Sequence, residues 1–239
     1  TGDSPKDGLP DRVGVGDEGV GVSSRRGGSA PTVIRSSDPR PEATLARDVR
    51  ISDADGIGRG SLREKAQANL AAIRTLKRIE SEDRLAESDE KAALVKYTGW
   101  GAMPGVFEPQ ASREWKGIGD ELREVLTSEE FASARASTPN AHYTSPEVIQ
   151  AIWKGMERFG FQAGGHILEP SMGVGHFFGL MPEGLYPGTR RTGVELDSIT
   201  ARIGTRLYPD SNVHGKALED AARPSEFCDA AVVNIPFGN

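Results

Sequence analysis

The sequence predicts an α/β fold in the second half of the chain, with a parallel sheet and helices on its faces. From position 144 onward, short apolar runs alternate with helical stretches; the runs are "HILEP", "RTGVELD", "NVHGKA" and "DAAVVNIPF". Buried strands that are separated by helices are typical of a parallel sheet. Glycines and carboxylates follow these strands directly, at the edge where such a sheet binds ligands.

The chain divides into three parts by composition. Residues 1–60 contain 11 Gly, 5 Pro and 7 Ser and almost no apolar period, so we expect a disordered low-complexity tail over 1–45. A helical N-terminal region over 46–137 and the sheet domain over 138–239 follow.

The first helix begins with a capping box made by Ser61 and Glu64. Its apolar stripe at helical spacing predicts about five turns; the stripe is Leu62, Ala66, Leu70, Ile73, Leu76 and Ile79. Shorter helices are predicted over 89–97, 119–126 and 128–136, and Thr127 with Glu130 caps the last of them.

The stretch "YTGWGAMPGVFE" interrupts the helical period with three glycines and a proline among aromatic residues. Tyr97 and Trp100 have two interpretations here. They fold over a ligand, or they pack a helix against the sheet.

The next helix is predicted to begin with a second capping box, formed by Thr144 and Glu147, with Pro146 in its first turn. One apolar face follows, made of Val148, Ile149, Ile152, Trp153, Met156 and Phe159. Four strands are half of a typical open sheet, so we expect the sheet to be incomplete in this chain and the last strand to be central.

Charge and composition exclude several classes of function. A formal charge of −6 and a pI near 5.4 exclude a strongly basic global field, so any nucleic-acid contact must be local. One cysteine, Cys228, suits a reducing cytosol. Four scattered histidines without metal-ligand spacing predict no metal site, and no apolar run is long enough to predict a membrane span.

The glycines after the first strand, in "EPSMGVGHF", allow close approach of backbone to a ligand at Gly173 and Gly175. A purely structural turn is the alternative. The pattern does not match the dinucleotide-binding fingerprint G-x-G-x-x-G, because Gly179 comes one position late. It does not match the hydrolase motif G-x-S-x-G either, because Glu169 stands where that motif has its first glycine.

The second strand ends in "VELD", and a carboxylate at the position of Glu195 can accept both hydroxyls of a ribose. The alternative role, a helix cap, suits Asp197 or Ser198 better. After the third strand, Glu219 or Asp220 could accept from an adenine amino group, although a solvated loop charge explains them equally well.

The last motif is "NIPF", residues 234–237. Methylation of an exocyclic amine needs acceptors that hold its two N–H bonds, and Asn234 can offer its side-chain carbonyl while Ile235 offers its backbone carbonyl. Pro236 would keep the turn rigid, and Phe237 would stack on a flipped base. The alternative is a strand-terminal turn with Phe237 in the core.

Four motifs, taken in order, resemble those of the gamma-group N6-adenine DNA methyltransferases. They are Thr144-Ser145-Pro146, "LEPSMGVGHF", "GVELD" and "NIPFG". Three longer stretches resemble, more narrowly, the methylase segment of large methylase-helicase proteins of plasmids and phages. They are "KYTGWGAMPGVFE", "ASARASTPNAHYTSPEVI" and "RRTGVELDSITARI". The resemblance covers roughly residues 46–239. It implies a Rossmann-like sheet, a bacterial cytoplasmic location, a DNA partner with a flipped adenine, and a helicase region in the same parent polypeptide.

The resemblance also implies S-adenosyl-L-methionine as cofactor. Thr144 would lie near its methionine carboxylate, and Glu195 would hold its ribose. Glu169, Gly173 and Gly175 would line the loop beneath it, and residues 234–237 would hold the base. Two departures concern Ile235, which replaces the first proline of the family motif, and Leu218, which precedes the acids Glu219 and Asp220 where the family usually has an acid followed by Phe.

Two further functions stay open from the sequence. The same site could methylate guanine in RNA or a glutamine side chain in protein, because both present a planar nitrogen. The chain could also be a non-catalytic cofactor-binding or scaffold module of a larger DNA-processing protein.

Overall fold

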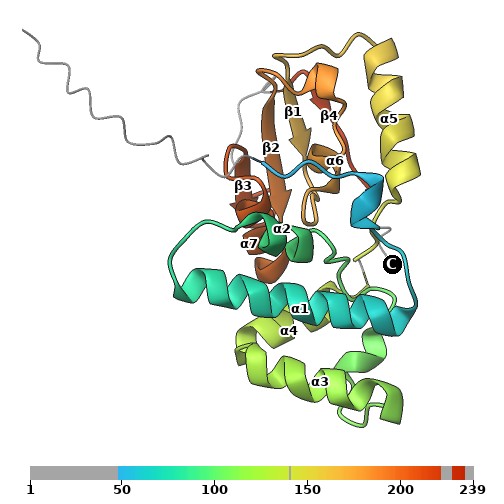
Figure 1. The fold of residues 1–239 in the computed structure, drawn as a ribbon, viewed down its shortest axis with the longest axis vertical. Helices are drawn as coiled ribbons and strands as arrows, with labels where there is room; N and C mark the ends of the chain where they lie inside the picture. Colours follow the sequence, from blue (N-terminus) through green and yellow to red (C-terminus); the bar gives the residue numbers. More distant parts are fainter. Residues whose placement is uncertain (1–47, 140, 222–227, 235–239) are drawn as a thin grey trace, which may run out of the picture. The chain divides into compact units, whose positions relative to one another are not determined.

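Four parallel strands form one sheet in the order β3-β2-β1-β4 (Figure 1). The computed structural model describes residues 48–139, 141–221 and 228–234, all within one unit, Ala43–Asn239. The strands are β1 (His166–Glu169), β2 (Arg190–Glu195), β3 (Asn212–Gly215) and β4 (Ala230–Ala231). The predicted α/β class and parallel sheet are therefore confirmed.

The strand order reverses beside β1, because the chain runs outward from β1 to β2 and β3 and then returns to place β4 on the other side. Ligands of open α/β sheets bind outside the carboxyl ends of the strands at such a reversal. Among the described residues β4 is an end strand, with Leu168 paired to Ala231. Its place in the middle of a wider sheet stays a prediction.

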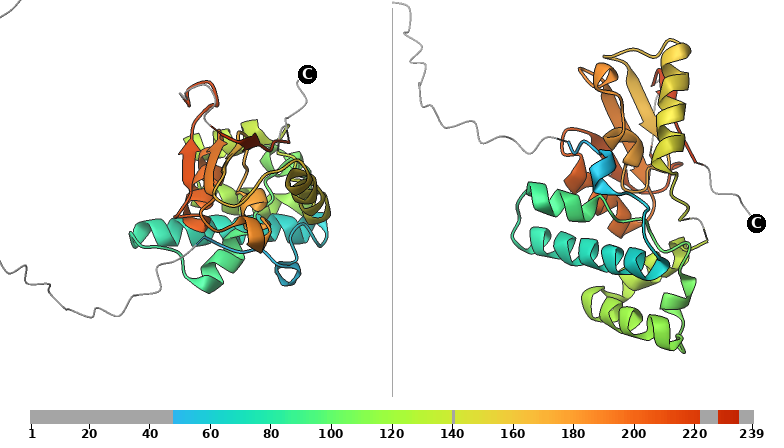
Figure 2. Two further views of the ribbon diagram at one scale, coloured as in Figure 1. Left: turned by 90° about the horizontal axis from the view of Figure 1, so that it is seen from above. Right: turned by 45° about the vertical axis from the view of Figure 1, so that its right-hand side comes forward.

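Helices cover the sheet and lie beyond its carboxyl ends. Figures 1 and 2 show α5 along the side of the sheet where β4 lies, and α1 to α4 gathered below the strand arrowheads. The helices are α1 (Leu62–Ser81), α2 (Ser88–Leu94), α3 (Arg113–Val125), α4 (Ser128–Ser137), α5 (Pro146–Arg158), α6 (His176–Gly179) and α7 (Ser198–Leu207), with short 3₁₀ turns at Asp53–Asp55, Pro104–Phe107 and Glu183–Leu185. In the described part of the chain, none of these helices has the length and apolar character that crossing a membrane requires.

The predicted helix starts are confirmed at two helices whose capping residues lie three positions apart in the sequence. Ser61 and Glu64 form their capping box at α1, and Thr127 with Glu130 does the same at α4. The third helix begins at Arg113, six residues before the predicted position 119, with Ser112 at its N-cap.

One prediction for α5 is wrong, and the structure qualifies another. Its N-cap is Ser145, and Thr144 lies outside the helix with its hydroxyl directed to Asn234. The predicted apolar face is buried only in part: Ile149 and Trp153 are buried, whereas the side chain of Phe159 is 94% exposed. An amphipathic pattern shows which residues can share a face, but the neighbouring elements decide how much of that face is covered.

The helical region is joined to the sheet through α7, whose Arg202 forms ion pairs with Glu80 of α1 and Glu130 of α4. Burial of Glu130 raises its pKa, but the hydrogen bonds from Lys77 and Arg202 outweigh this and bring it to about 2. In addition, the Ser133 hydroxyl of α4 donates to the Asp197 carboxylate at the start of α7, with an O···O distance of 2.8 Å. These polar contacts set the helical region against the carboxyl ends of the strands.

The glycine-rich loop after α2 is held by Asn69, a fully buried residue of α1. The Asn69 amide donates to the carbonyl of Gly99, and its Oδ1 accepts from the N–H of Thr98 at 2.9 Å. One side chain thus satisfies a backbone donor and a backbone acceptor of two adjacent residues. The apolar stripe predicted for this helix contains no signal for such a buried amide.

Tyr97 and Trp100 are almost completely buried in the core, and neither is among the described residues that line a cavity. Trp100 packs edge-on against Phe107, with ring centroids 5.7 Å apart. The packing interpretation of these aromatic residues is therefore confirmed. The residues of this motif that line a cavity are instead Thr98, Gly99, Gly101, Ala102 and Met103.

We expect Asn69→Leu to destabilise the fold by about 2–5 kcal/mol, because two backbone groups lose the side chain that binds them. Urea unfolding measures the change, and Gln67→Leu on the exposed face of the same helix is the matched control. A loss below about 1 kcal/mol would contradict the importance of this contact.

Candidate functional site

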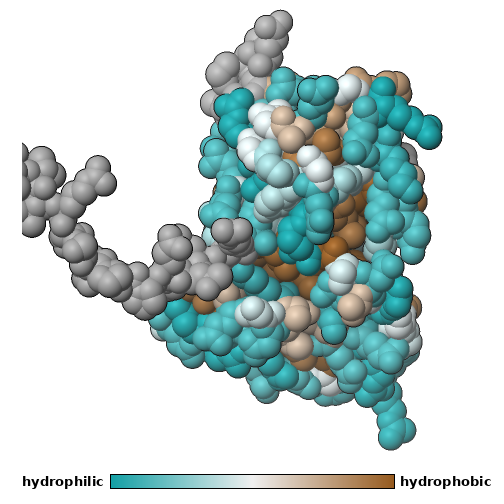
Figure 3. Space-filling view, turned by 45° about the horizontal axis from the view of Figure 1, so that its top comes forward, coloured by the Kyte–Doolittle hydropathy of each residue, from teal (hydrophilic) through white to brown (hydrophobic). Residues whose placement is uncertain are grey.

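A cavity of about 520 Å³ opens at the carboxyl ends of β1, β2 and β3, and we call it the strand-end cavity. Its walls come from the loops after these three strands, from the segment 141–144, and from α4. The volume is in the range of cavities that enclose a small-molecule ligand. Figure 3 shows that, on the face drawn there, apolar residues gather in a hollow whose rim is hydrophilic.

The strand-end cavity brings together six of the residues predicted from sequence, although they are spread over 91 positions of the chain; they are Thr144, Glu169, Gly173, Glu195, Glu219 and Asn234. Gly175 and Asp220 are not among its described lining residues. Ile235, Pro236 and Phe237 lie outside the described part of the chain.

Glu195 stands at the end of β2 with both carboxylate oxygens engaged by backbone. Oε2 accepts from the N–H of Gly173, and Oε1 accepts from the N–H of Asp197, both at 2.9 Å. Burial raises the pKa of Glu195 to about 7, against the effect of these hydrogen bonds. Each carboxylate oxygen retains a lone pair for a further donor.

The alternative role of Glu195 as a helix cap is excluded by the position of Asp197. The Asp197 carboxylate accepts from the N–H of Thr200 at 3.0 Å and caps α7. Ser198 is the first residue of that helix. The carboxylate of Glu195 is thus left to face the cavity.

Glu169, at the end of β1, is 3% exposed, and its Oε2 has no hydrogen-bond partner among the described residues. Burial, and then the nearby charge of Glu195, raise the pKa of Glu169 well above its ordinary value. A buried carboxyl group without a partner is costly. A ligand that brings a cation or a hydrogen-bond donor into the cavity would give this carboxyl group a partner and so remove that cost.

Asn234 follows β4 and contacts the opposite wall of the cavity. Its Nδ2 lies 3.0 Å from the carbonyl oxygen of His142 and 3.3 Å from the hydroxyl oxygen of Thr144. A carbonyl oxygen can only accept, so the NH₂ end of the amide must face this wall. The Oδ1 atom accepts no hydrogen bond from the described residues and is available to a ligand.

Gly175 is required by packing. Its φ is +86°, and a Cβ atom there would lie 2.5 Å from the ring of Tyr208. The structural alternative that the sequence left open therefore applies to Gly175. Gly173 does line the cavity, and its φ of +55° turns its N–H toward Glu195.

Several lining residues were not predicted from the sequence. Ser133 and Ser137 of α4 reach the cavity because that helix packs against α7. Lys216 and Leu218 follow β3, and Leu218 is 46% exposed at the cavity. Lys216 and Leu218 could have been predicted, because they follow directly after a strand. The sequence of α4 contains no signal that its serines line a cavity.

The pH dependence of stability should reveal the buried carboxyl group of Glu195. Its folded pKa of about 7 exceeds the ordinary value of 4.5, so its contribution to stability is present below pH 4.5 and is lost as the pH rises through about 7. The size of this loss is at most about 3 kcal/mol. His176, with its pKa lowered by burial to about 4, acts in the opposite sense below pH 6.5.

The difference between the wild-type protein and Glu195→Gln isolates the contribution of Glu195. Urea unfolding between pH 4.5 and 8 should show a variant whose stability falls less steeply with pH than that of the wild type. Parallel profiles would contradict the assignment.

Comparison with known proteins gives one local sequence match. The chain is 31% identical over 121 residues to "Defense against restriction protein B" of Escherichia phage P1. The match covers 50% of this chain and 5% of that protein, so the chain spans a small part of its relative's length. No family model matches the sequence.

Two solved structures align with the chain at TM-scores below 0.5. A "putative class I S-adenosylmethionine-dependent methyltransferase" of Listeria monocytogenes aligns at a TM-score of 0.38 and 14% identity, over 73% of this chain and 60% of its own. The methyltransferase subunit of a type I restriction-modification system of Streptococcus thermophilus aligns at 0.36 and 13% identity, over 71% and 44%.

Proposed function

We propose that this chain is an S-adenosylmethionine-dependent methyltransferase domain that acts on N6 of adenine in DNA. One observation carries the proposal: Glu195 and Asn234, from two different strand ends, line the same cavity. The first suits a nucleoside sugar, and the second suits a planar nitrogen that accepts a methyl group. The order of the motifs along the chain, which resembles that of the gamma-group enzymes, adds to this support.

The residues of the strand-end cavity fit the cofactor. The carboxylate of Glu195 would accept from the ribose hydroxyls, and the buried unpartnered oxygen of Glu169 would gain a donor or a positive charge. The hydroxyl of Thr144 accepts from Asn234, so its own proton is free to be donated to the methionine carboxylate. Glu219 lines the cavity, so we assign the adenine amino contact to Glu219 and not to Asp220.

Asn234 would hold the nitrogen that receives the methyl group. When bound, the cofactor supplies an electrophilic methyl group on its sulfonium sulfur. The wall at His142 and Thr144 fixes the NH₂ end of Asn234, so Oδ1 accepts from the target N–H without first having to rotate. A second acceptor, the backbone carbonyl of Ile235, stays a prediction, as do the roles of Pro236 and Phe237.

The chemistry of this site needs no covalent intermediate with the protein. Two acceptors would draw the target nitrogen toward a tetrahedral geometry and hold its lone pair in line with the methyl group. As the N–C bond forms, the C–S bond of the cofactor would break, S-adenosylhomocysteine would be the leaving group, and one N–H proton of the amine would pass to solvent. Orientation of the two substrates would supply most of the rate enhancement. Among the described residues, no group of three or more His, Cys, Asp or Glu side chains could hold a metal ion.

DNA is the favoured acceptor because the local relative in phage P1 carries a name that concerns restriction. A helicase region in the same parent polypeptide and a cytoplasmic bacterial location stay predictions. The experiment is transfer of a tritiated methyl group to duplex and single-stranded DNA, followed by nucleoside analysis. Label in N6-methyladenine is the expected result.

Other outcomes of this experiment identify the alternatives. Label in RNA guanine or in protein glutamine would keep the chemistry and change the acceptor. Cofactor binding in calorimetry without any transfer would support a non-catalytic module. Absence of cofactor binding would contradict the whole proposal.

A further inference from the structure

A second cavity, of about 590 Å³, lies beside the strand-end cavity, and we call it the helix-side cavity. It is lined by the loop Ser52–Arg59, by Lys65 of α1, by the loop Thr98–Met103, and by the start of α5. The two cavities share Gly99 and the segment Ala141–Thr144 as a common wall. Apart from this common wall, the residues that line the helix-side cavity have no role in the proposed methyl transfer.

The common wall is held rigidly from both sides. A Cβ atom at Gly101 would lie 2.2 Å from the carbonyl oxygen of Ala141, so the loop and the wall are in direct backbone contact. Asn69 fixes the same loop at Thr98 and Gly99. On its other side, the wall binds the amide of Asn234.

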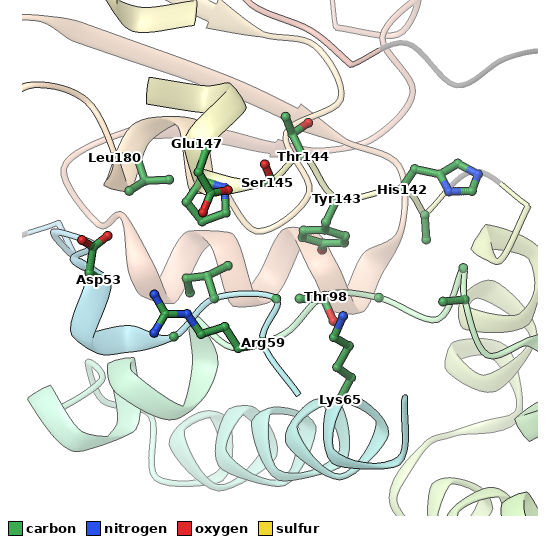
Figure 4. A pocket seen from close by; sticks show the side chains of 18 of the residues that line it. Asp53, Arg59, Lys65, Thr98, His142, Tyr143, Thr144, Ser145, Glu147 and Leu180 are labelled. Carbon is green, nitrogen blue, oxygen red and sulfur yellow. The ribbon is translucent and has the colours of Figure 1, made fainter. Parts of the chain in front are cut away.

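Two cations, Lys65 and Arg59, line the helix-side cavity. Figure 4 shows Lys65 pointing into it from α1 and Arg59 from the loop before that helix, opposite Tyr143, Thr144 and Glu147. Neither side chain forms an ion pair or a hydrogen bond with the described residues. Three other cations of α1 do form ion pairs; they are Arg74, Lys77 and Arg78.

Two acids also line this cavity, and their positions restrict where an anion could bind. Asp53 stands on the opposite side of the cavity from Lys65 (Figure 4). Glu147 lies close enough to Arg59 for that cation to contribute, after the hydrogen bonds at the start of α5, to lowering the pKa of Glu147. The end of the cavity at Lys65, next to the common wall, is therefore the one with excess positive charge.

We infer that the helix-side cavity binds a phosphate of the DNA strand that presents the methyl acceptor, with Lys65 as the principal contact and Arg59 as a second one. The inference rests on the proposed function, because a base at Asn234 places the sugar and phosphate of its nucleotide near the common wall. It also accounts for DNA binding by a chain of net charge −6, since the positive charge is local. Phosphate contacts position a strand without reading its sequence.

The test is the binding of a fluorescein-labelled single-stranded DNA oligonucleotide, measured by anisotropy at several salt concentrations. Lys65→Gln should raise the Kd about tenfold at low salt. It should also lower the slope of log Kd against log salt by about 0.7, the value for one phosphate of a single strand. Lys65→Arg should restore most of the affinity, and Arg59→Gln should have a smaller effect.

Arg63→Gln is the matched control, because Arg63 is an exposed cation two residues away that does not line the cavity. Its salt slope should match that of the wild type. Calorimetry with S-adenosylhomocysteine should give the same affinity for all variants. Thermal unfolding shows whether each variant is folded.

The outcomes separate this inference from the proposed function. If Lys65→Gln and Arg63→Gln bind DNA with equal slopes, the phosphate site is refuted while cofactor binding still supports a methyltransferase. If the wild type binds cofactor but no DNA, the phosphate site is likewise refuted. If DNA binding depends on Lys65 but the cofactor does not bind, the phosphate site stands and the methyltransferase proposal fails.

Discussion

Replacing Asn234 by alanine should reduce methyl transfer by at least about 100-fold and change cofactor affinity by less than about threefold. The Oδ1 atom of Asn234 is the described acceptor for the target nitrogen, and alanine removes it. Of the residues that we expect to bind the cofactor, Glu169, Gly173 and Glu195 form no hydrogen bond with Asn234 and keep their geometry. Thr144 loses only the N–H that it accepts at 3.3 Å and keeps its own proton for the cofactor. Initial rates with tritiated cofactor give the first quantity, and calorimetry gives the second.

The control is Asn212→Ala, which removes an exposed amide at the start of β3, away from the described lining of the cavity. It should leave both quantities unchanged. An equal loss of transfer and of cofactor affinity in Asn234→Ala would mean that this amide supports the cofactor site and not the acceptor. Unchanged transfer would remove Asn234 from the site.

Replacing Glu195 by alanine should weaken cofactor binding by about 100-fold or more. Two ribose hydroxyls would lose a charged acceptor, and hydrogen bonds to charged groups contribute about 1.5–3 kcal/mol each. The N–H groups of Gly173 and Asp197 would also lose their acceptor, so the loop after β1 would be less well ordered for a ligand. Isothermal titration with S-adenosylhomocysteine measures the loss.

Glu183→Ala serves as the control for charge, because Glu183 is an exposed acid outside the described lining of the cavity. It should bind the cofactor as the wild type does. A Glu195→Ala variant that retains wild-type affinity would show that the carboxylate only organises the loop after β1. The cofactor would then have to bind elsewhere.

The two predictions also test each other. Asn234→Ala should affect transfer alone, whereas Glu195→Ala should affect binding and, at low cofactor concentration, transfer as well. A reversed pattern would place the cofactor at the end of β4 and the acceptor at the end of β2. The roles that we assign to the two sides of the strand-end cavity, on either side of β1, would then have to be exchanged.

Features that depend on near neighbours in the chain were predictable from sequence. The capping boxes at Ser61 and Thr127 and the cap at Asp197 each involve residues three positions apart, and all three form. The alternation of strands and helices predicted the parallel sheet, because a buried strand and an amphipathic helix have different periods. The strand ends then predicted where polar residues collect.

Predictions failed where a distant partner competes for the same atoms. Thr144 fits a capping box as well as Thr127 does, but its hydroxyl is taken by Asn234, which lies 90 residues later in the sequence. Asn69 looks like an interruption of an apolar stripe, yet it is buried because the loop at Thr98 needs both ends of an amide. The pattern of neighbouring residues contains no information about hydrogen-bond partners that lie far away in the sequence.

The sequence by itself determined the α/β class, most helix starts, and the residue types at the strand ends, because these follow from interactions within one or two turns of chain. Only the tertiary structure decided that Glu195 and Asn234 share a cavity, that Gly175 serves packing, and that Lys65 enters a second cavity beside them. The reason is that cavities lie between elements, and their lining depends on how helices and strands pack. That packing is fixed by contacts such as those of Arg202 with Glu80 and Glu130, which join residues far apart in the chain.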